Sequence, residues 1–157
     1  MSIKSIKEIF NSLEGSWLFD REIKNLTTDV LDFANGKASF TFLDKTDYNS
    51  LYYEETGVLS LSNSSKKINF TRKYIYQLKD DTIHIILNDG ITKGELFQSL
   101  IPLDDGSSFV GTEHVCRLDL HNGKYFFKNE LSFDTEYTVK GSNSNLEIKS
   151  VYTKIEN

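Results

Sequence analysis

Phe70, Arg72, Tyr74 and Tyr76 alternate along one segment and bring together the groups best suited to chemistry. In an extended strand, side chains two residues apart lie on the same face. The guanidinium of an arginine donates two parallel hydrogen bonds to a carboxylate or phosphate, and tyrosine hydroxyls add further donors. The spacing therefore predicts a strand face that binds an anionic group, with Arg72 at its centre.

Glu55 gives Arg72 a competing role. A buried arginine needs a partner of opposite charge, and the alternation of the preceding segment places Tyr53 and Glu55 on one face. One hypothesis is a structural pair between Glu55 and Arg72, and the other is a contact between Arg72 and a ligand. The two hypotheses are compatible if the pair lines a cavity.

His114 and Cys116 form a second pair on one predicted strand face. Both residue types bind metals, but a structural zinc site needs four ligands and a catalytic one needs three, and the chain has a single cysteine. Neighbours at this spacing also meet poorly as a cysteine–histidine nucleophile. We predict no metal site. His114 is either a proton-transfer group or ligand contact in a pocket, or an interior histidine beside a small buried cysteine.

The elements that position these residues are predicted to be strands that follow one short helix. Ser5 and Glu8 have the spacing of a capping box, and a helix over about residues 3–13 carries an apolar stripe formed by Ile6, Ile9, Phe10 and Leu13. Short alternating segments with regular turn signals then fill residues 16–155, as in an all-β barrel. We predict one domain over residues 1–157: a single antiparallel up-and-down β-barrel of about eight to ten strands, with the helix capping one end.

The composition limits the classes of partner that the protein is expected to bind. The net charge of −5 is spread through the chain, which argues against nucleic acid because such partners need a basic patch. No stretch approaches the roughly 20 apolar residues of a membrane span, and one cysteine excludes an intramolecular disulfide. We expect a cytoplasmic protein, monomeric or homodimeric, with a small-molecule partner, no cofactor, and neither a nucleic-acid nor a membrane partner.

Two resemblances agree with this outline. A helix followed by Gly15-x-Trp17 resembles the lipocalin and fatty-acid-binding superfamily. That resemblance implies a cation packed over Trp17 at the closed end of the barrel, supplied by Arg21 or by Lys154. Such a contact stabilises by about 0.5–2 kcal/mol.

The second resemblance covers nearly the whole chain. The chain is similar to an uncharacterised lipocalin-like family catalogued as domain of unknown function 6314, and the resemblance implies a calycin-type barrel with a pocket. The segments that carry it are Leu13-Glu14-Gly15-Ser16-Trp17, Gly36-x-Ala38-x-Phe40, Tyr53-x-Glu55-x-Gly57, Phe70-x-Arg72-x-Tyr74-x-Tyr76, His114-x-Cys116-x-x-Asp119 and Tyr152-x-Lys154. One departure is Phe97-Gln98, where the family has a Phe-His pair.

Our leading hypothesis is a barrel that binds a small, mostly apolar ligand carrying an anionic or polar group. The alternative is an isomerase, cyclase or lyase in the same pocket, with His114 or Glu55 as the proton-transfer group. A third hypothesis is a solid barrel that acts as an interaction module. The predicted ligand-binding residues are Trp17, Arg21, Tyr53, Glu55, Arg72, Tyr74, Tyr76, His114, Cys116 and Tyr125.

Overall fold

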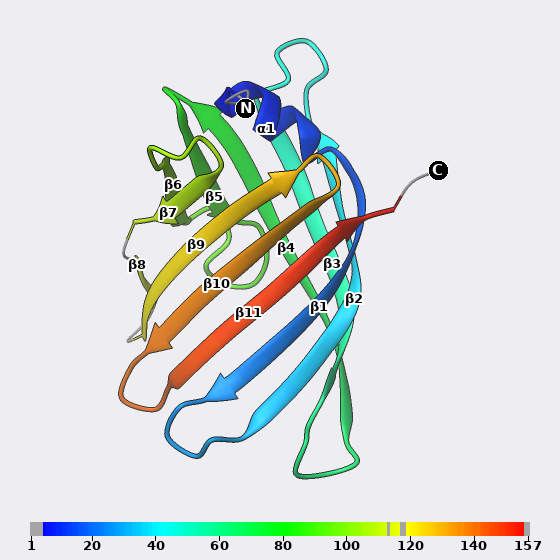
Figure 1. The fold of residues 1–157 in the computed structure, drawn as a ribbon, viewed down its shortest axis with the longest axis vertical. Helices are drawn as coiled ribbons and strands as arrows, with labels where there is room; N and C mark the ends of the chain where they lie inside the picture. Colours follow the sequence, from blue (N-terminus) through cyan, green and yellow to red (C-terminus); the bar gives the residue numbers. More distant parts are fainter. Residues whose placement is uncertain (1–4, 113, 117–118, 156–157) are drawn as a thin grey trace.

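The strands form one continuous antiparallel wall with a short helix at one end (Figure 1). The structure is a computed structural model that describes residues 5–112, 114–116 and 119–155, with the backbone alone for 114–116. The strands are β1 (Gly15–Asn25), β2 (Leu31–Phe42), β3 (Ser50–Ser60), β4 (Lys67–Lys79), β5 (Thr82–Leu87), β6 (Leu96–Pro102), β7 (Ser108–Gly111), β8 (His114–Cys116), β9 (Asp119–Asn129), β10 (Ser132–Lys140) and β11 (Asn145–Lys154).

Sequential pairing closes this wall into a barrel. Each strand pairs with the next as far as β7, β11 pairs with β1, and β10 bridges β9 and β11. β7 and β8 pair with different parts of β9, so they act as one interrupted strand in a closed barrel of ten. The all-β prediction, with an antiparallel barrel and an N-terminal helix, is confirmed.

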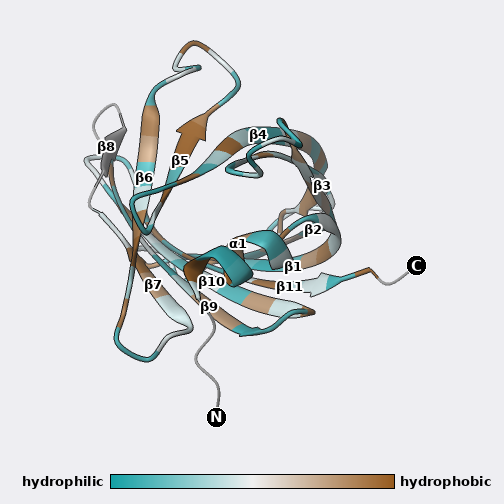
Figure 2. Ribbon diagram, turned by 90° about the horizontal axis from the view of Figure 1, so that it is seen from above, coloured by the Kyte–Doolittle hydropathy of each residue, from teal (hydrophilic) through white to brown (hydrophobic). Residues whose placement is uncertain are grey.

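The helix α1 (Ile6–Ser12) covers one end of the barrel, as the view from above shows (Figure 2). Ser5 caps it, because its Oγ accepts a hydrogen bond from the backbone N–H of Glu8 at 3.1 Å. Ile9, Phe10 and Leu13 are buried beneath it. The described helix is shorter than the predicted one, and no described helix is long and apolar enough to cross a membrane.

Aromatic side chains fill the half of the barrel beneath α1, which we call the helix end. Phe133 lies at its centre, stacked on Tyr152 at 4.4 Å between ring centroids and edge-to-face with Trp17 at 4.9 Å. Phe40 packs edge-to-face with Tyr76 at 5.2 Å. These rings are almost completely buried, so the helix end is a packed core.

Two glycines let the wall close tightly beside this core. Gly36 and Gly57 are opposite each other in the register of β2 and β3. A Cβ on Gly36 would lie 2.6 Å from the Cα of Gly57, and a Cβ on Gly57 would lie 2.8 Å from the ring of Phe70 and 2.9 Å from that of Phe19. Only glycine fits at either position without displacing backbone or packed rings.

An irregularity in β6 turns two consecutive side chains inward. The register of β5 against β6 shifts between Ile85 and Ile86, which leaves Phe97 as an extra residue. Phe97 contacts the rings of Tyr74 and Tyr137, and its neighbour Gln98 is fully buried. A bulge of this kind redirects side chains that strict alternation would separate.

Candidate functional site

An ion pair joins Arg21 of β1 to Glu55 of β3 over the inner face of β2, the strand between them. Arg21 Nη1 donates to Glu55 Oε2 at 2.8 Å, and Arg21 Nη2 donates to Glu55 Oε1 at 3.2 Å. Side-chain exposures are 13% for Arg21 and 3% for Glu55. This two-pronged geometry is the strong form of an arginine–carboxylate contact. Arg21 Nε also donates to Ser150 Oγ at 2.8 Å, which fixes the guanidinium against β11.

Two tyrosine hydroxyls complete the surroundings of this pair. Tyr53 donates to Glu55 Oε1 at 2.5 Å, Arg21 Nη2 donates to the hydroxyl of Tyr152 at 3.0 Å, and the two hydroxyls lie 3.1 Å apart. Burial raises the pKa of both tyrosines above the ordinary value. Burial alone would lower the pKa of Arg21, but Tyr152, Glu55 and Tyr53 together raise it, so the guanidinium stays charged.

Arg72 lies outside this closed network although it is opposite Glu55 in the register of β3 and β4. The hypothesis of a Glu55–Arg72 ion pair is therefore wrong, because Arg21 and Tyr53 occupy both carboxylate oxygens. Arg72 is exposed, and in the described part of the chain no carboxylate forms an ion pair with it. Tyr74 is the main cause of its raised pKa, and partial burial acts against it. Two arginines and one glutamate leave a net positive charge.

Half-buried apolar side chains share the inner face with Arg72 at the end of the barrel away from α1, which we call the open end. Ile23 and Ile148 face each other across β1 and β11, and Leu59 and Ile68 do so across β3 and β4. Alternation puts all four on the same inner face as Arg21 and Arg72. Ile68 is 38% exposed and the other three are half-buried. The open end thus combines an exposed cation with an apolar wall.

The cation over Trp17 is Lys154 rather than Arg21. Lys154 Nζ lies 5.5 Å from the Trp17 ring and donates to the carbonyl of Ser12 at 2.9 Å. Trp17 Nε1 donates to the carbonyl of Leu13 at 2.9 Å. Arg21 instead packs over Phe19, 4.6 Å from its centroid. Trp17 therefore fastens the helix and the last strand to the core, and it is remote from the open end.

A second hydroxyl chain runs through the middle of the barrel. The hydroxyls of Tyr76 and Tyr125 lie 3.1 Å apart, and those of Tyr125 and Tyr137 lie 2.9 Å apart. Burial is the leading cause of the raised pKa of each of the three groups. Tyr76 and Tyr125 are enclosed, whereas Tyr137 is half-buried. The three hydroxyls therefore form a hydrogen-bonded path from the helix end to the open end.

The ten predicted site residues thus divide into four groups. Arg72 and Tyr74 are at the open end, and Arg21, Glu55 and Tyr53 form the network behind them. Tyr76, Tyr125 and Trp17 belong to the enclosed interior. His114 and Cys116 are in β8, but their side chains lie outside the described part of the structure.

Sequence reasoning missed four residues of this region: Tyr137, Tyr152, Phe97 and Gln98. Tyr137 and Tyr152 alternate along their strands like the predicted tyrosines, and this signal could have included them. Phe97 and Gln98 face inward through the register shift in β6, for which the local sequence carries no marker. A tertiary feature therefore decides their direction.

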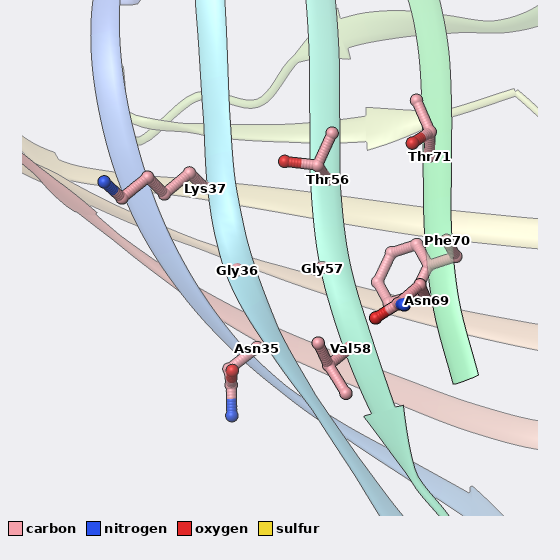
Figure 3. Close-up of a pocket in the computed structure, with 9 residues that line it drawn as sticks. All are labelled: Asn35, Gly36, Lys37, Thr56, Gly57, Val58, Asn69, Phe70 and Thr71. Carbon is pink, nitrogen blue, oxygen red and sulfur yellow. The ribbon is translucent and has the colours of Figure 1, made fainter. Parts of the chain in front are cut away.

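Two surface depressions lie on the outer wall. The first, of about 480 Å³, follows β2, β3 and β4 beside Gly36 and Gly57, among the exposed polar residues Asn35, Lys37, Thr56, Asn69 and Thr71 (Figure 3). The second, of about 500 Å³, is lined by surface charges of β1 and β11, including Glu22 and Lys149. Neither contains a buried polar group. Among the described residues, no cluster of three or more His, Cys, Asp or Glu could hold a metal.

Comparison with protein families accounts for almost the whole chain. The model of a family of unknown function, DUF6314, matches residues 13–154. The chain belongs to this family. The match confirms the second sequence resemblance, and it includes every residue of the Arg21–Glu55–Arg72 region. A search of the curated proteins finds no match.

Solved structures share the DUF6314 chain's fold at low sequence identity. An S-type phycobiliprotein lyase from Guillardia theta is 14% identical, with a TM-score of 0.62 over 98% of this chain and 94% of the other. EF1p2_mFAP2b bound to DFHBI is 10% identical, with a TM-score of 0.54 over 96% and 100%. Rv2717c from M. tuberculosis is 9% identical, with a TM-score of 0.53 over 99% and 100%. At these identities the similarity shows the barrel fold.

Proposed function

We propose that this DUF6314 barrel binds a small, mostly apolar molecule at its open end, and that Arg72 contacts an anionic group of that molecule. One observation carries the proposal: Arg21 neutralises Glu55, which leaves Arg72 exposed beside the ion pair. A ligand carboxylate or phosphate would supply the missing negative charge.

The surroundings of Arg72 support the apolar character of the ligand. Ile23, Leu59, Ile68 and Ile148 are only partly covered, so a ligand could bury apolar surface that water now contacts. Two solved structures of the same fold are consistent with a small-molecule ligand. One is named a phycobiliprotein lyase, and the other is described as bound to DFHBI.

An enzyme that uses Glu55 as its base has less support. Both oxygens of Glu55 accept hydrogen bonds, from Arg21 and from Tyr53, and the carboxylate is almost completely buried. A proton-transfer group must reach the proton that it moves. The geometry instead favours a positioning role, in which Glu55 holds Arg21 and leaves Arg72 for the ligand.

Native mass spectrometry of the chain produced in its own host tests this proposal. We expect a bound mass on the wild type that is lost from Arg72→Ala. Lys73→Ala is the matched control, because it removes one positive charge from the adjacent residue, whose side chain faces outward. The control should retain the mass. A wild type without a bound mass, or an Arg72→Ala variant that keeps it, would contradict the proposal.

A further inference from the structure

Gln98 carries a buried acceptor to which no described residue donates a hydrogen bond. The residue is fully buried, and its Nε2 donates to the carbonyl of Thr112 at 3.2 Å and to that of His121 at 3.3 Å. These bonds span the interruption between β7 and β8. They also fix the orientation of the amide, because the reverse orientation would place Oε1 against two carbonyl oxygens. Among the described residues, Oε1 itself has no hydrogen-bond partner.

This acceptor faces the barrel interior between two glycines. A Cβ on Gly111 would lie 2.8 Å from Oε1, and a Cβ on Gly123 would lie 2.9 Å from it. The same Cβ on Gly123 would lie 2.7 Å from the Cζ of Tyr137, so the Tyr137 ring is beside the acceptor. A side chain at Gly111 would therefore clash with the Gln98 amide, and one at Gly123 would clash with the Tyr137 ring and with Oε1. A buried carbonyl oxygen in such a place favours any ligand that brings an N–H or O–H donor.

Aromatic rings connect the acceptor to Arg72. Phe97 precedes Gln98, and its ring is stacked with Tyr74 at 5.8 Å and tilted against Tyr137 at 6.1 Å. All three rings are half-buried. Tyr74 in turn interacts with Arg72. A flat ligand that packs on these rings therefore has an acceptor on one side and a cation on the other.

We propose that the ligand is a planar aromatic or conjugated acid whose N–H or O–H group donates to Gln98 Oε1 while its anionic group binds Arg72. This inference rests on the proposed function and adds the ligand class. The Tyr137 ring now lies beside Oε1, so its edge moves aside when the donor enters.

Two matched fluorescent dyes test the inference without a change to the protein. The first is the anilinonaphthalene sulfonate isomer whose sulfonate is at the opposite end of the molecule from its N–H. The second is the same dye methylated on that nitrogen, which removes the donor and keeps the rings and the charge. We expect methylation to weaken binding to the wild type about tenfold, the effect of one lost hydrogen bond to a buried acceptor.

Gln98→Met and Arg72→Ala separate the two parts of the proposal, with the fluorescence of Trp17 reporting that each variant is folded. Gln98→Met should bind both dyes equally, because the acceptor is gone. Arg72→Ala should bind both dyes more weakly and keep the preference for the N–H dye. If the wild type binds both dyes equally in an Arg72-dependent way, the donor inference is wrong and the proposed function stands. If neither dye binds, or binding ignores Arg72, both are overturned for this class of molecule.

Discussion

The two ends of the barrel use the same alternation of inward side chains for different purposes. At the helix end, Phe133, Trp17 and Tyr152 pack ring against ring under α1. At the open end, the inner face carries Arg72 and partly exposed isoleucines and leucines. The difference shows that side chains fill one half of the barrel interior more completely than the other. Its packed half stabilises the fold, and its other half leaves polar and apolar groups available to a ligand.

High pH should have the largest effect on the comparison, because it removes protons from tyrosines that are enclosed in the barrel. Burial raises the pKa of Tyr53, Tyr76, Tyr125 and Tyr152 above the 10.0 of a free tyrosine. The unfolded chain therefore releases these protons first, and stability falls as the pH rises above about 10. By about pH 11 each buried tyrosine loses up to about 1.4 kcal/mol of stabilisation.

Tyrosinate absorbance measured with Trp17 fluorescence checks that prediction. The four enclosed tyrosines should ionise only together with unfolding, at the same pH at which the Trp17 fluorescence changes. Ionisation of these four tyrosines near pH 10 in a folded chain would instead show that they are open to solvent.

Phe133→Ala should give the largest effect of a single substitution. The ring is 2% exposed and lies against Trp17 and Tyr152, so its removal leaves a cavity in the packed half. We expect a loss of about 3–5 kcal/mol in the free energy of unfolding, measured in urea. Phe33→Ala is the matched control, because Phe33 is 46% exposed on β2 and should cost under about 1 kcal/mol. An equal loss of unfolding free energy in the two variants would contradict the claim that the helix end is the packed half.

Glu55→Gln should have the next largest effect on the free energy of unfolding. It tests whether the ion pair between the two halves stabilises the barrel. The change leaves Arg21 buried without its counter-charge, at a cost of about 3 kcal/mol. Glu54→Gln, one residue away and hydrogen-bonded to Tyr52, should cost under about 1 kcal/mol. Urea unfolding of both variants makes the comparison. A Glu55→Gln variant as stable as the wild type would mean that the pair contributes nothing to the core.

Arg72→Ala should have the smallest effect on stability. Its exposed side chain forms no ion pair with a carboxylate of the described residues, so we expect a change within about 1 kcal/mol in thermal or urea unfolding. A loss as large as that of Glu55→Gln would make Arg72 a core residue and remove the basis for a ligand contact.

The sequence predicts the architecture well because the architecture depends on local patterns. Two such patterns depend only on residues close in sequence: the Ser5 cap, and the alternation of Phe70, Arg72, Tyr74 and Tyr76. The structure contains both. The same alternation puts Glu55 and Arg72 on one face, and the strand register places them opposite each other.

The site was only partly predictable because its contacts join strands that are not neighbours. Register places Glu55 opposite Arg72 on the adjacent strand, yet the glutamate binds Arg21, two strands away in the sheet and 34 residues away in sequence. No pattern within one strand encodes that choice. The inward direction of Phe97 and Gln98 depends in the same way on the shift between β5 and β6.

Reaction with an arginine-selective dicarbonyl reagent tests the central claim most directly, because it compares Arg21 and Arg72 in one folded chain. Peptide mass spectrometry would give the extent of modification at each position. We predict rapid modification of Arg72 and protection of Arg21, whose guanidinium is held by Glu55, Ser150 and Tyr152. Equal protection of the two arginines would contradict the account, because Arg72 would then have no face free for a ligand.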